Sequence, residues 1–295
     1  MTSQIMNNIS VDQNKEENLL LLFSQKTLYN KAKTTKYFTL LLAIINFLLG
    51  IVSKTTDLYK DQFLIFIFII ALSSKYLKNL SCKFNDLASS TQELIDRKLY
   101  GFKIESRFLE NHTASELISV AKDLKEKYPQ KYLVEISNSG TDKPNGVKDW
   151  YTKIYSNLTV DESILKCQKQ NIYWDKYLIK CYKNILNTLC IFIGIIFLIL
   201  YWNQGVNSFV LGIISSFSIF DLLKNELSMT KKFTTHNIEI DSMISASVNL
   251  ESINTDFLEN LQSKIFSRRK SYLNVPSLIH KLKSIKLHSN YDRDN

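Results

Sequence analysis

The 295-residue chain has few of the residues that interrupt helices, with only 7 glycines and 3 prolines. Its four cysteines, Cys82, Cys167, Cys181 and Cys190, show no CxxC or Cys/His spacing, which argues against a disulfide framework or a zinc site. The histidines are scattered, and no Walker loop, GxSxG or HExxH motif is present. We therefore expect an all-helical protein that is not an enzyme and requires no metal or cofactor.

Charge is absent from Asn184 to Phe220, a run of 37 residues without Asp, Glu, Lys, Arg or His. Because a helix rises about 1.5 Å per residue and a bilayer core needs about 20 apolar residues, this run is long enough for two spans. The polar segment Asn203–Asn207 divides it and predicts a hairpin with spans at Ile185–Trp202 and Val206–Leu223. A buried hairpin in a soluble protein is the alternative, which so long an uncharged run disfavours.

Two shorter uncharged segments, Tyr37–Ser53 and Gln62–Ser74, predict another hairpin near the N-terminus. The first segment is slightly short for a bilayer core, but its flanking lysines can extend towards the headgroups. The second segment is shorter still, and it is interpreted as a span because it follows the first after an eight-residue linker. Residues Met1–Lys36 are polar and charged, so we expect no cleavable signal peptide. The chain is therefore predicted to be an integral membrane protein with four spans in a 2+2 layout.

The placement of lysines predicts how the spans are oriented. The net charge of +9 collects beside the apolar runs, as in membrane proteins, whereas the linkers of the two hairpins hold only Lys54 and Lys60. The positive-inside rule then places both termini and the middle region in the cytoplasm. The chain divides into an N-terminal cytoplasmic region (1–36) with an amphipathic helix at Asn18–Ala32 along the inner membrane surface, a first hairpin (37–75), a cytoplasmic helical stalk or sensor region (76–183), a second hairpin (184–223) and a helical C-terminal region (224–295).

The middle region begins and ends with apolar residues spaced by three and four, over Leu77–Leu94 and Val160–Ile185. Such spacing is typical of a seam between paired helices, so we predict an antiparallel stalk. A polar residue in a seam fixes its register at some cost in stability. The predicted neighbours are Leu77 with Cys181, Phe84 with Trp174, and Leu94 with Ile164, and the polar members of the seam are Thr91 and Asn171.

Local signals predict further helix starts and a loop. Thr113–Glu116 and Thr159–Glu162 are capping boxes, each of which marks the beginning of a helix. The Gly-, Pro- and Asn-rich segment Asn138–Gly146 predicts a loop, for which a surface turn is favoured over a phosphate-binding nest. Asp256–Lys270 predicts an amphipathic helix that turns Phe257, Leu258, Leu261 and Ile265 inward and ends before Pro276.

The predicted spans contain small and weakly polar residues but no ionisable ones. A small residue at every fourth position lets two helices approach closely. Two interpretations stay open: packing within a four-helix bundle, or contact between protomers around a wet path. Four helices enclose no lumen, so a pore requires a homo-oligomer. The residues concerned are Asn46, Gly50, Asn187, Ser208, Gly212, Ser215 and Ser216.

Aromatic and polar residues also gather before and along the second stalk helix. Trp and Tyr near a membrane often anchor at the interface or fill a stalk core, and a pocket that stacks a base is the alternative. Arginine is scarce in this chain and forms bidentate phosphate contacts that lysine cannot. The candidate ligand-binding residues are therefore Arg107, Trp150, Tyr151, Gln168, Asn171, Trp174, Asp175 and Arg268.

Several short motifs occur in a definite order around the 2+2 layout. They are Tyr29-Asn30-Lys31-Ala32-Lys33 before the first span, Glu93-Leu94-Ile95-Asp96 and Tyr100-Gly101 after the second, Asp149-Trp150-Tyr151, Cys167-Gln168-Lys169-Gln170-Asn171 and Trp174-Asp175 before the third, and Leu261-Gln262-Ser263-Lys264-Ile265-Phe266, Arg268 and Val275-Pro276 near the end.

In these motifs the chain resembles the SMODS-associated four-transmembrane effector family of bacterial cyclic-oligonucleotide anti-phage systems (CBASS). It departs from the family at Phe102-Lys103, where Leu-Pro is expected. The resemblance implies a pore-forming effector of the bacterial inner membrane that a cyclic oligonucleotide activates, causing abortive infection. The implied partners are the lipid bilayer, the cyclic oligonucleotide and further copies of the chain, without DNA or RNA. A non-pore membrane scaffold and a constitutive small-solute channel are the alternatives.

Overall fold

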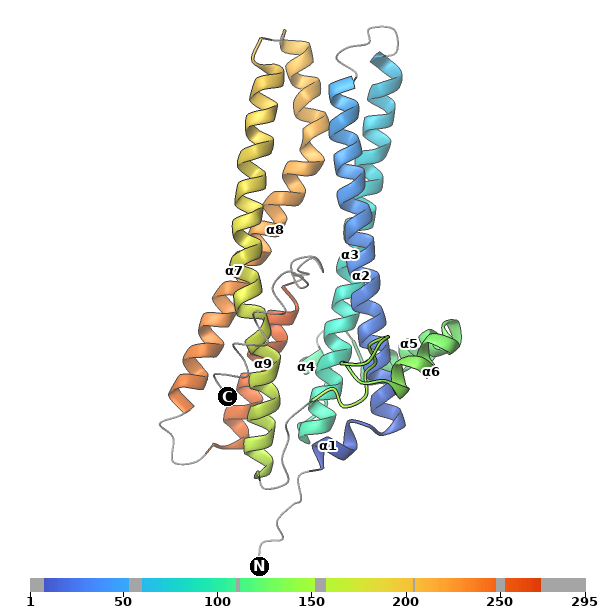
Figure 1. Cartoon of the computed structure of the whole chain (residues 1–295), viewed down its shortest axis with the longest axis vertical. Helices are drawn as coiled ribbons and strands as arrows, with labels where there is room; N and C mark the ends of the chain where they lie inside the picture. Colours follow the sequence, from blue (N-terminus) through green and yellow to red (C-terminus); the bar gives the residue numbers. More distant parts are fainter. Residues whose placement is uncertain are drawn as a thin grey trace, which may run out of the picture. The chain divides into compact units, whose positions relative to one another are not determined.

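The computed structural model describes residues 8–52, 60–109, 112–151, 158–203, 205–247 and 253–271. Side chains are described throughout these ranges except at residues 60, 61, 173–178, 207, 208, 211 and 247. Every regular element in the described ranges is a helix, which confirms the all-helical prediction (Figure 1).

The longest described helices are α2 (Glu16–Val52), α3 (Lys60–Tyr100), α7 (Val160–Tyr201) and α8 (Val206–Ser247). They contain between 37 and 42 residues, so each is about 55–63 Å long, roughly twice the thickness of a bilayer core. Each helix can therefore hold a span and a polar extension. Within the described residues, three helices are long and apolar enough to cross a membrane: α2, α3 from Gln62 onwards, and α7 from Ile179 onwards.

The second predicted hairpin has its break where the sequence indicates. Helix α7 ends at Tyr201 and α8 begins at Val206, on either side of the polar turn. Helix α8 then continues without interruption through polar residues to Ser247. The fourth predicted span, Val206–Leu223, lies in α8, where some side chains are not described, and it stays a prediction.

The prediction that Asn18–Ala32 forms a short helix of its own is wrong. These residues form the first part of α2, which continues as one helix into the first apolar segment. Their apolar side chains are covered by protein: Leu22 and Phe23 are buried, and Phe23 packs edge-on against Tyr132 with ring centroids 5.2 Å apart. An amphipathic pattern shows that a helix has an apolar face, but it does not show whether lipid or protein covers that face.

Shorter helices complete the chain, and both predicted capping boxes are confirmed. The Thr113 hydroxyl accepts from the Glu116 amide at 3.2 Å, and the Thr159 hydroxyl accepts from the Glu162 amide at 3.3 Å. The loop at 138–146 is also confirmed as irregular, whereas Pro276 lies outside the described residues. The shorter helices are α1 (Ile9–Asp12), α4 (Ser106–Leu109), α5 (Ala114–Lys127), α6 (Pro129–Ser137) and α9 (Thr255–Arg269).

The chain divides into two compact units, each described here by itself. The long helices contribute to both units, and no division falls at the end of a predicted span, so the five-region division stays a prediction. Unit 1 comprises Met1–Asn30, Phe84–Lys176 and Phe233–Tyr272, and unit 2 comprises Lys31–Lys83, Tyr177–Lys232 and Leu273–Asn295.

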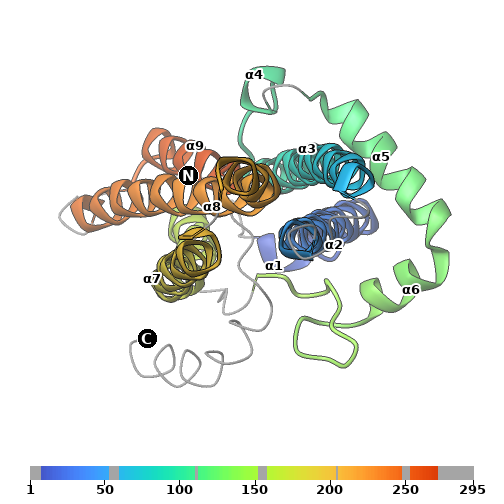
Figure 2. The same cartoon turned by 90° about the horizontal axis from the view of Figure 1, so that it is seen from above.

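Unit 1 has a continuous apolar core around α3. Leu94 of α3 and Ile164 of α7, which the seam pattern pairs, lie in the same buried cluster. Leu258, Leu261 and Ile265 of α9 complete that cluster, so the predicted inward face of α9 is confirmed. Helices α5 and α6 lie beside the unit 1 parts of α2 and α3 (Figure 2). The side chain of Trp174 is not described, and the antiparallel stalk stays a prediction.

In unit 2, small residues allow close helix contacts within the chain. A side chain at Gly50 of α2 would overlap Ser215 of α8, and one at Gly212 would overlap the ring of Tyr201. The Tyr201 hydroxyl also donates to the Gly50 carbonyl at 3.3 Å. These contacts favour the packing interpretation for Gly50, Gly212 and Ser215.

Polar contacts join the same helices. The buried Asn46 amide donates to the Ser218 hydroxyl at 3.3 Å, so α2 and α8 share a polar contact inside an apolar segment. Lys36 Nζ lies 2.7 Å from a Glu226 carboxylate oxygen, which also accepts from the Tyr182 hydroxyl at 2.8 Å. One carboxylate of α8 thus binds both α2 and α7. The remaining predicted span residues are Asn187, which is exposed, Ser216, which is buried, and Ser208, whose side chain is not described.

Replacing Gly50 by Ala is expected to destabilise the protein by about 1–3 kcal/mol, because the new methyl group overlaps Ser215. Gly194→Ala is the matched control, since Gly194 lies in α7 with open space around its Cα. Thermal unfolding of the purified protein in detergent measures both variants. A Gly50→Ala protein with unchanged stability but altered oligomer size would show instead that this face joins protomers.

Candidate functional site

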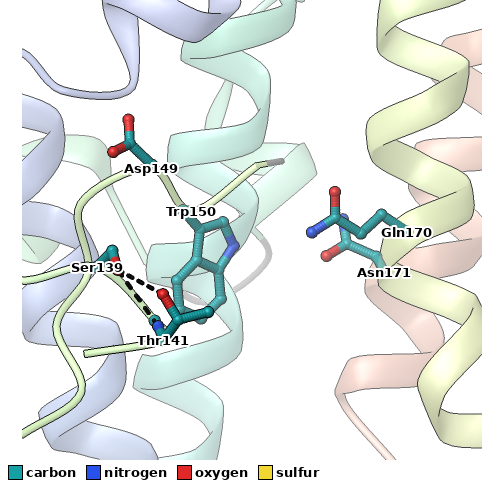
Figure 3. Close-up of a pocket in the computed structure, with 7 residues that line it drawn as sticks. Ser139, Thr141, Asp149, Trp150, Gln170 and Asn171 are labelled. Carbon is teal, nitrogen blue, oxygen red and sulfur yellow. Dashed lines mark hydrogen bonds between the residues drawn. The ribbon is translucent and has the colours of Figure 1, made fainter. Parts of the chain in front are cut away.

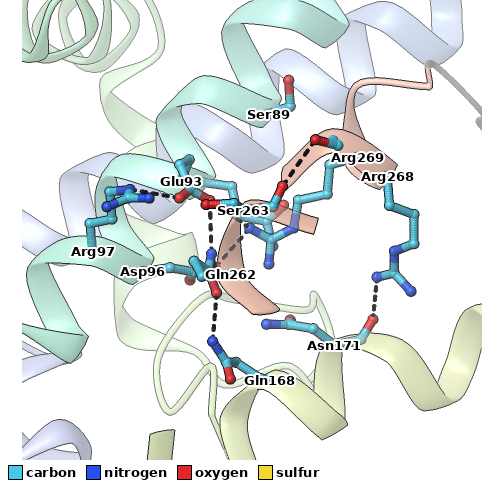
Figure 4. A network of polar contacts seen from close by, with 12 residues as sticks. Ser89, Glu93, Asp96, Arg97, Gln168, Asn171, Gln262, Ser263, Arg268 and Arg269 are labelled. Carbon is cyan, nitrogen blue, oxygen red and sulfur yellow. Dashed lines mark hydrogen bonds and ion pairs between the residues drawn. The ribbon is translucent and has the colours of Figure 1, made fainter. Parts of the chain in front are cut away.

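Charged side chains are buried together at the centre of unit 1. Arg97 Nε lies 2.8 Å from Glu93, and Arg269 of α9 lies 2.7 Å from Asp96 (Figure 4). The four side chains are between 0 and 7% exposed. Each of the two acids thus lies beside a base, because an unpaired buried charge is strongly unfavourable.

The position of α3 explains why these charges must be paired. Residues Ala88–Arg97 are all buried, so this part of α3 is covered on every side. Glu93 and Arg97 are four residues apart and face each other along the helix. The Arg97 guanidinium also donates to the Lys103 carbonyl at 2.9 Å and covers the ring of Phe108 at 3.9 Å. Asp96 points to α9, which supplies its partner Arg269.

Gln262 of α9 connects α3 with α7. Its Nε2 donates to Glu93 at 2.8 Å and to Asp96 at 3.0 Å, and its carbonyl oxygen accepts from Gln168 of α7 at 3.2 Å. Gln168 also donates to the Leu258 carbonyl at 2.9 Å. The predicted seam between α3 and α7 therefore has a third participant, because α9 supplies the polar link between them (Figure 4).

Tyr151 and Asn171 extend this network towards the surface of unit 1. The buried Tyr151 hydroxyl donates to Asp96 at 2.5 Å and accepts from Asn171 Nδ2 at 3.1 Å. The Asn171 backbone carbonyl accepts from Arg268 at 2.8 Å, and Arg268 also donates to Asn237 at 3.1 Å. Asn171 is therefore bonded through both its side chain and its backbone.

Burial changes the acid–base properties of this network. The pKa of Glu93 is raised to about 7, chiefly because burial disfavours the carboxylate; Asp96 adds to the rise, whereas Arg269 and Arg97 oppose it. Burial and the nearby Asp96 carboxylate also raise the pKa of the Tyr151 hydroxyl well above its ordinary value. Tyr151 therefore stays protonated and donates to Asp96 at neutral pH.

A pocket adjoins the network at Asn171, which belongs to both. Its volume is about 540 Å³, within the range of small-molecule sites. The ring of Trp150 lies on one side, and Gln170 and Asn171 of α7 lie on the other (Figure 3). The remaining lining residues are Ser139, Gly140, Thr141 and Asp149.

The N-terminal segment holds Trp150 in position. On one side, the Asp149 amide donates to Asn14 at 3.0 Å, and Asn14 donates back to the Asp149 carboxylate at 2.7 Å. On the other, the Tyr151 amide donates to Gln13 at 2.7 Å, and Gln13 donates back to the Tyr151 carbonyl at 3.2 Å. Asp149 has a φ of 51°, which is unfavourable for a residue other than glycine. The hydrogen bonds to Asn14 and Gln13 stabilise this backbone conformation.

The 138–146 loop uses its backbone amides for its own structure. Gly146 N donates to the Ser139 carbonyl, and Lys148 N donates to the Asn138 carbonyl, at 2.7 and 3.0 Å. The Ser139 amide donates to the Asp142 carboxylate at 2.7 Å. A side chain at Gly146 would overlap Asn138, which explains the glycine. With these donors occupied, the surface turn is favoured over the phosphate nest.

The structure places the six candidate ligand residues whose side chains are described in three different surroundings. Trp150 and Asn171 line the pocket, whereas Tyr151, Gln168 and Arg268 belong to the buried network. Arg107 does not join them: it is 68% exposed and lies 2.7 Å from Glu105. The side chains of the other two, Trp174 and Asp175, are not described.

Sequence reasoning missed most of the charged network. Glu93 and Arg97 offered a local signal, because they form a four-residue acid–base pair beside the seam residue Leu94. Asp96 and Gln262 stand in the family motifs, but nothing in the sequence indicates the partners of these or of the other residues, which are far away in the chain. The missed residues are Gln13, Asn14, Glu93, Asp96, Arg97, Gln262 and Arg269.

Metal binding has no visible basis in the part of the chain that the structure describes. There, no three His, Cys, Asp or Glu side chains are grouped to hold a metal ion, and all four cysteines are unpaired. The chemistry available in the pocket is stacking on Trp150 and hydrogen bonding to amide, hydroxyl and carboxylate groups.

The long apolar helices define a multi-span membrane protein. Its unit 1 also contains a pocket of the size of a small-molecule site. The chain belongs to the SMODS-associating 4TM effector domain family, whose model matches residues 7–294. The family expected from the sequence motifs is thereby confirmed, and it is not a known enzyme family. No curated protein and no solved structure matches the chain.

The buried Glu93 predicts a pH-dependent stability. In the unfolded chain its carboxyl ionises near the ordinary pKa of 4.5, whereas in the folded protein it keeps its proton until about pH 7. Between these values the folded state binds more protons, so Glu93 makes the free energy of unfolding fall as pH rises, with no further change above about pH 7. Comparing thermal unfolding of the wild type and Glu93→Gln between about pH 5 and pH 7.5 should show this slope only in the wild type.

The exposed Glu126→Gln is the control and should keep the wild-type pH profile. Identical profiles for the wild type and Glu93→Gln would contradict the raised pKa of Glu93, whatever the absolute stability of the variant.

Proposed function

We propose that this protein is a CBASS-type effector of the bacterial inner membrane, which a cyclic oligonucleotide activates to breach the membrane and cause abortive infection. The family description supports two parts of this proposal, since it names an effector and its association with SMODS proteins. We interpret the associated protein as the nucleotidyltransferase that supplies the cyclic oligonucleotide. The proposal further places both termini and unit 1 in the cytoplasm, in agreement with the positions of the lysines.

The pocket beside Trp150 is the observation that best supports binding of a cyclic oligonucleotide. An aromatic face provides a stacking platform for a base, and amide side chains can hydrogen-bond to its edge. Trp150 is partly exposed and held from both sides, and Gln170 and Asn171 lie opposite (Figure 3). A platform fixed in advance loses little freedom on binding.

Asn171 gives the proposed ligand a route to the buried charges. It lines the pocket and donates to Tyr151, which donates to Asp96. Helix α7 continues from Asn171 into the uncharged segment after Lys183, and α3 connects Asp96 with the uncharged Gln62–Ser74. A change in the network can therefore act on the apolar segments through continuous helices.

Membrane breach requires more than one copy in this proposal. Gly50 and Ser215 contact each other within the chain, so other surfaces must join protomers. Helix α7 exposes apolar residues along its uncharged segment, including Ile191, Phe192 and Ile199, and it also exposes the polar Asn187. A homo-oligomer could place Asn187 beside a wet path, whereas bilayer lipid would cover it in a monomer.

Dye leakage from liposomes that contain the purified full-length protein tests the proposal. Leakage only after addition of a cyclic oligonucleotide, from a panel of such compounds, supports the activated effector. Leakage without any ligand would identify a constitutive channel, and no leakage under any condition would favour a non-pore scaffold.

Trp150→Ala is expected to weaken binding of the activating cyclic oligonucleotide by about tenfold or more, because one stacked base contributes about 1–3 kcal/mol. Trp202→Ala is the matched control, since Trp202 is 79% exposed and follows the end of α7. Equilibrium binding to the detergent-solubilised protein measures both variants. Equal affinities of wild type and Trp150→Ala would remove Trp150 from the binding site.

Asn171→Leu and Tyr151→Phe separate ligand binding from its transmission. Asn171→Leu alters a pocket wall and removes the bond to Tyr151, so both affinity and the leakage threshold should change. Tyr151→Phe removes only the bonds of the hydroxyl and leaves the lining residues in place. It should bind the ligand as the wild type does but require a different ligand concentration for leakage. An unaltered leakage threshold in both variants would contradict transmission through this network.

A further inference from the structure

Unit 2 contains a second pocket, of about 400 Å³, between α2, α3 and α8. Its apolar side includes Leu72 of α3 and Phe217 of α8, which are 53% and 66% exposed. Its polar side includes Lys75 and Lys78 of α3 and Asp221 of α8. The pocket is thus lined by apolar and charged residues at the same time, and it shares no residue with the Trp150 pocket.

Both helices change from apolar to charged in the same order along the chain. Helix α3 passes from Leu72 to Lys75 and Lys78 as it leaves the uncharged Gln62–Ser74. Helix α8 likewise passes from Phe217 to Asp221 at the end of its uncharged segment. The transition takes one to two helical turns on each helix, about 6–9 Å. Such a gradient matches a lipid molecule, whose acyl chains and headgroup meet over a similar depth.

The charges of the pocket favour an anion. Lys78 Nζ lies 2.8 Å from Asp221, so these two charges compensate each other. Lys75 is exposed and gives the lining residues one more positive charge than negative. A lysine ammonium is a compact charge with three donors, suited to an oxyanion such as phosphate.

A hydroxyl group adds a hydrogen-bond donor on the opposite wall. Ser218 of α8 lines the pocket, and its oxygen accepts from Asn46 at 3.3 Å. Because that bond uses the oxygen as acceptor, the Ser218 O–H is free to donate to a ligand oxygen. Lys75 of α3 and Ser218 of α8 thus offer donors from two walls of the same pocket.

We propose that this pocket binds the phosphate group of an anionic phospholipid, with Lys75 as the main electrostatic contact and the acyl chains against Leu72 and Phe217. The exposed apolar side of the pocket favours a phospholipid over a soluble phosphate, because a soluble phosphate has no apolar part to contact Leu72 and Phe217. The inference does not depend on cyclic-oligonucleotide activation, since it concerns different residues in the other unit.

Lipid titration of the full-length protein in detergent micelles tests the proposal, with the shift in thermal unfolding as readout. Phosphatidylglycerol should stabilise the wild type at lower concentration than phosphatidylcholine does. Lys75→Ala should raise the phosphatidylglycerol concentration required by about fivefold, the effect expected of one lysine at an anionic surface, and leave the phosphatidylcholine response unchanged. Lys75→Arg, which keeps the charge, should retain most of the preference.

Lys83→Ala is the matched control. Lys83 is an exposed lysine of α3 that does not line the pocket, and its replacement changes the net charge equally. Equal weakening in Lys75→Ala and Lys83→Ala would reduce the effect to general surface attraction and overturn the proposal. Stabilisation by inorganic phosphate alone, equal to that by phosphatidylglycerol, would also overturn it, because the lipid chains would then contribute nothing.

Discussion

The burial of charge on α3 is the constraint on which unit 1 depends. Glu93, Asp96 and Arg97 lie in a part of the helix that protein covers on every side, so water cannot solvate them. Removing one partner from such a buried group typically costs about 3–5 kcal/mol. Helix α9 must therefore dock with Arg269 and Gln262 in register, and the loop after Lys148 must bring the Tyr151 hydroxyl to Asp96. Apolar packing alone would tolerate small continuous shifts of α9, whereas these bonds restrict α9 to discrete registers.

In unit 2 the long helices expose apolar side chains, whereas in unit 1 α3 buries charged ones. Its apolar side chains are widely exposed, as suits contact with lipid, and its helices approach through small residues such as Gly50 and Ser215. Its charges lie near the ends of the uncharged segments, where Lys36 and Tyr182 share the carboxylate of Glu226. One continuous helix such as α2 thus has protein-covered apolar residues in its first part and exposed apolar residues in its second.

Features set by neighbouring residues could be predicted from the sequence, and features set by distant partners could not. The capping boxes at Thr113 and Thr159, the break after Tyr201 and the inward face of α9 are local patterns, and each is confirmed. The pairing of Asp96 with Arg269 joins residues far apart in the chain, and no periodic pattern in the sequence indicates it. The same holds for Asn14 with Asp149, which positions Trp150. Of the candidate site, Trp150 and Asn171 were predicted because aromatic and amide side chains are conspicuous there, whereas the charges behind them look like an ordinary solvated helix face.

A polar network is better suited than an apolar core to respond to a ligand, because its members can exchange partners in discrete steps. Gln262 already donates to both Glu93 and Asp96, and Arg269 lies 2.7 Å from Asp96 but 3.9 Å from Glu93. An exchange that brings Arg269 to Glu93 would move α9 relative to α3 within unit 1 and leave Asp96 with its hydrogen bond from Tyr151. A ligand shifts such an equilibrium only as far as it prefers one arrangement. Asn171 can supply that preference, since a ligand that hydrogen-bonds to its amide fixes the side chain that donates to Tyr151, and the Tyr151 hydroxyl donates to the Asp96 carboxylate.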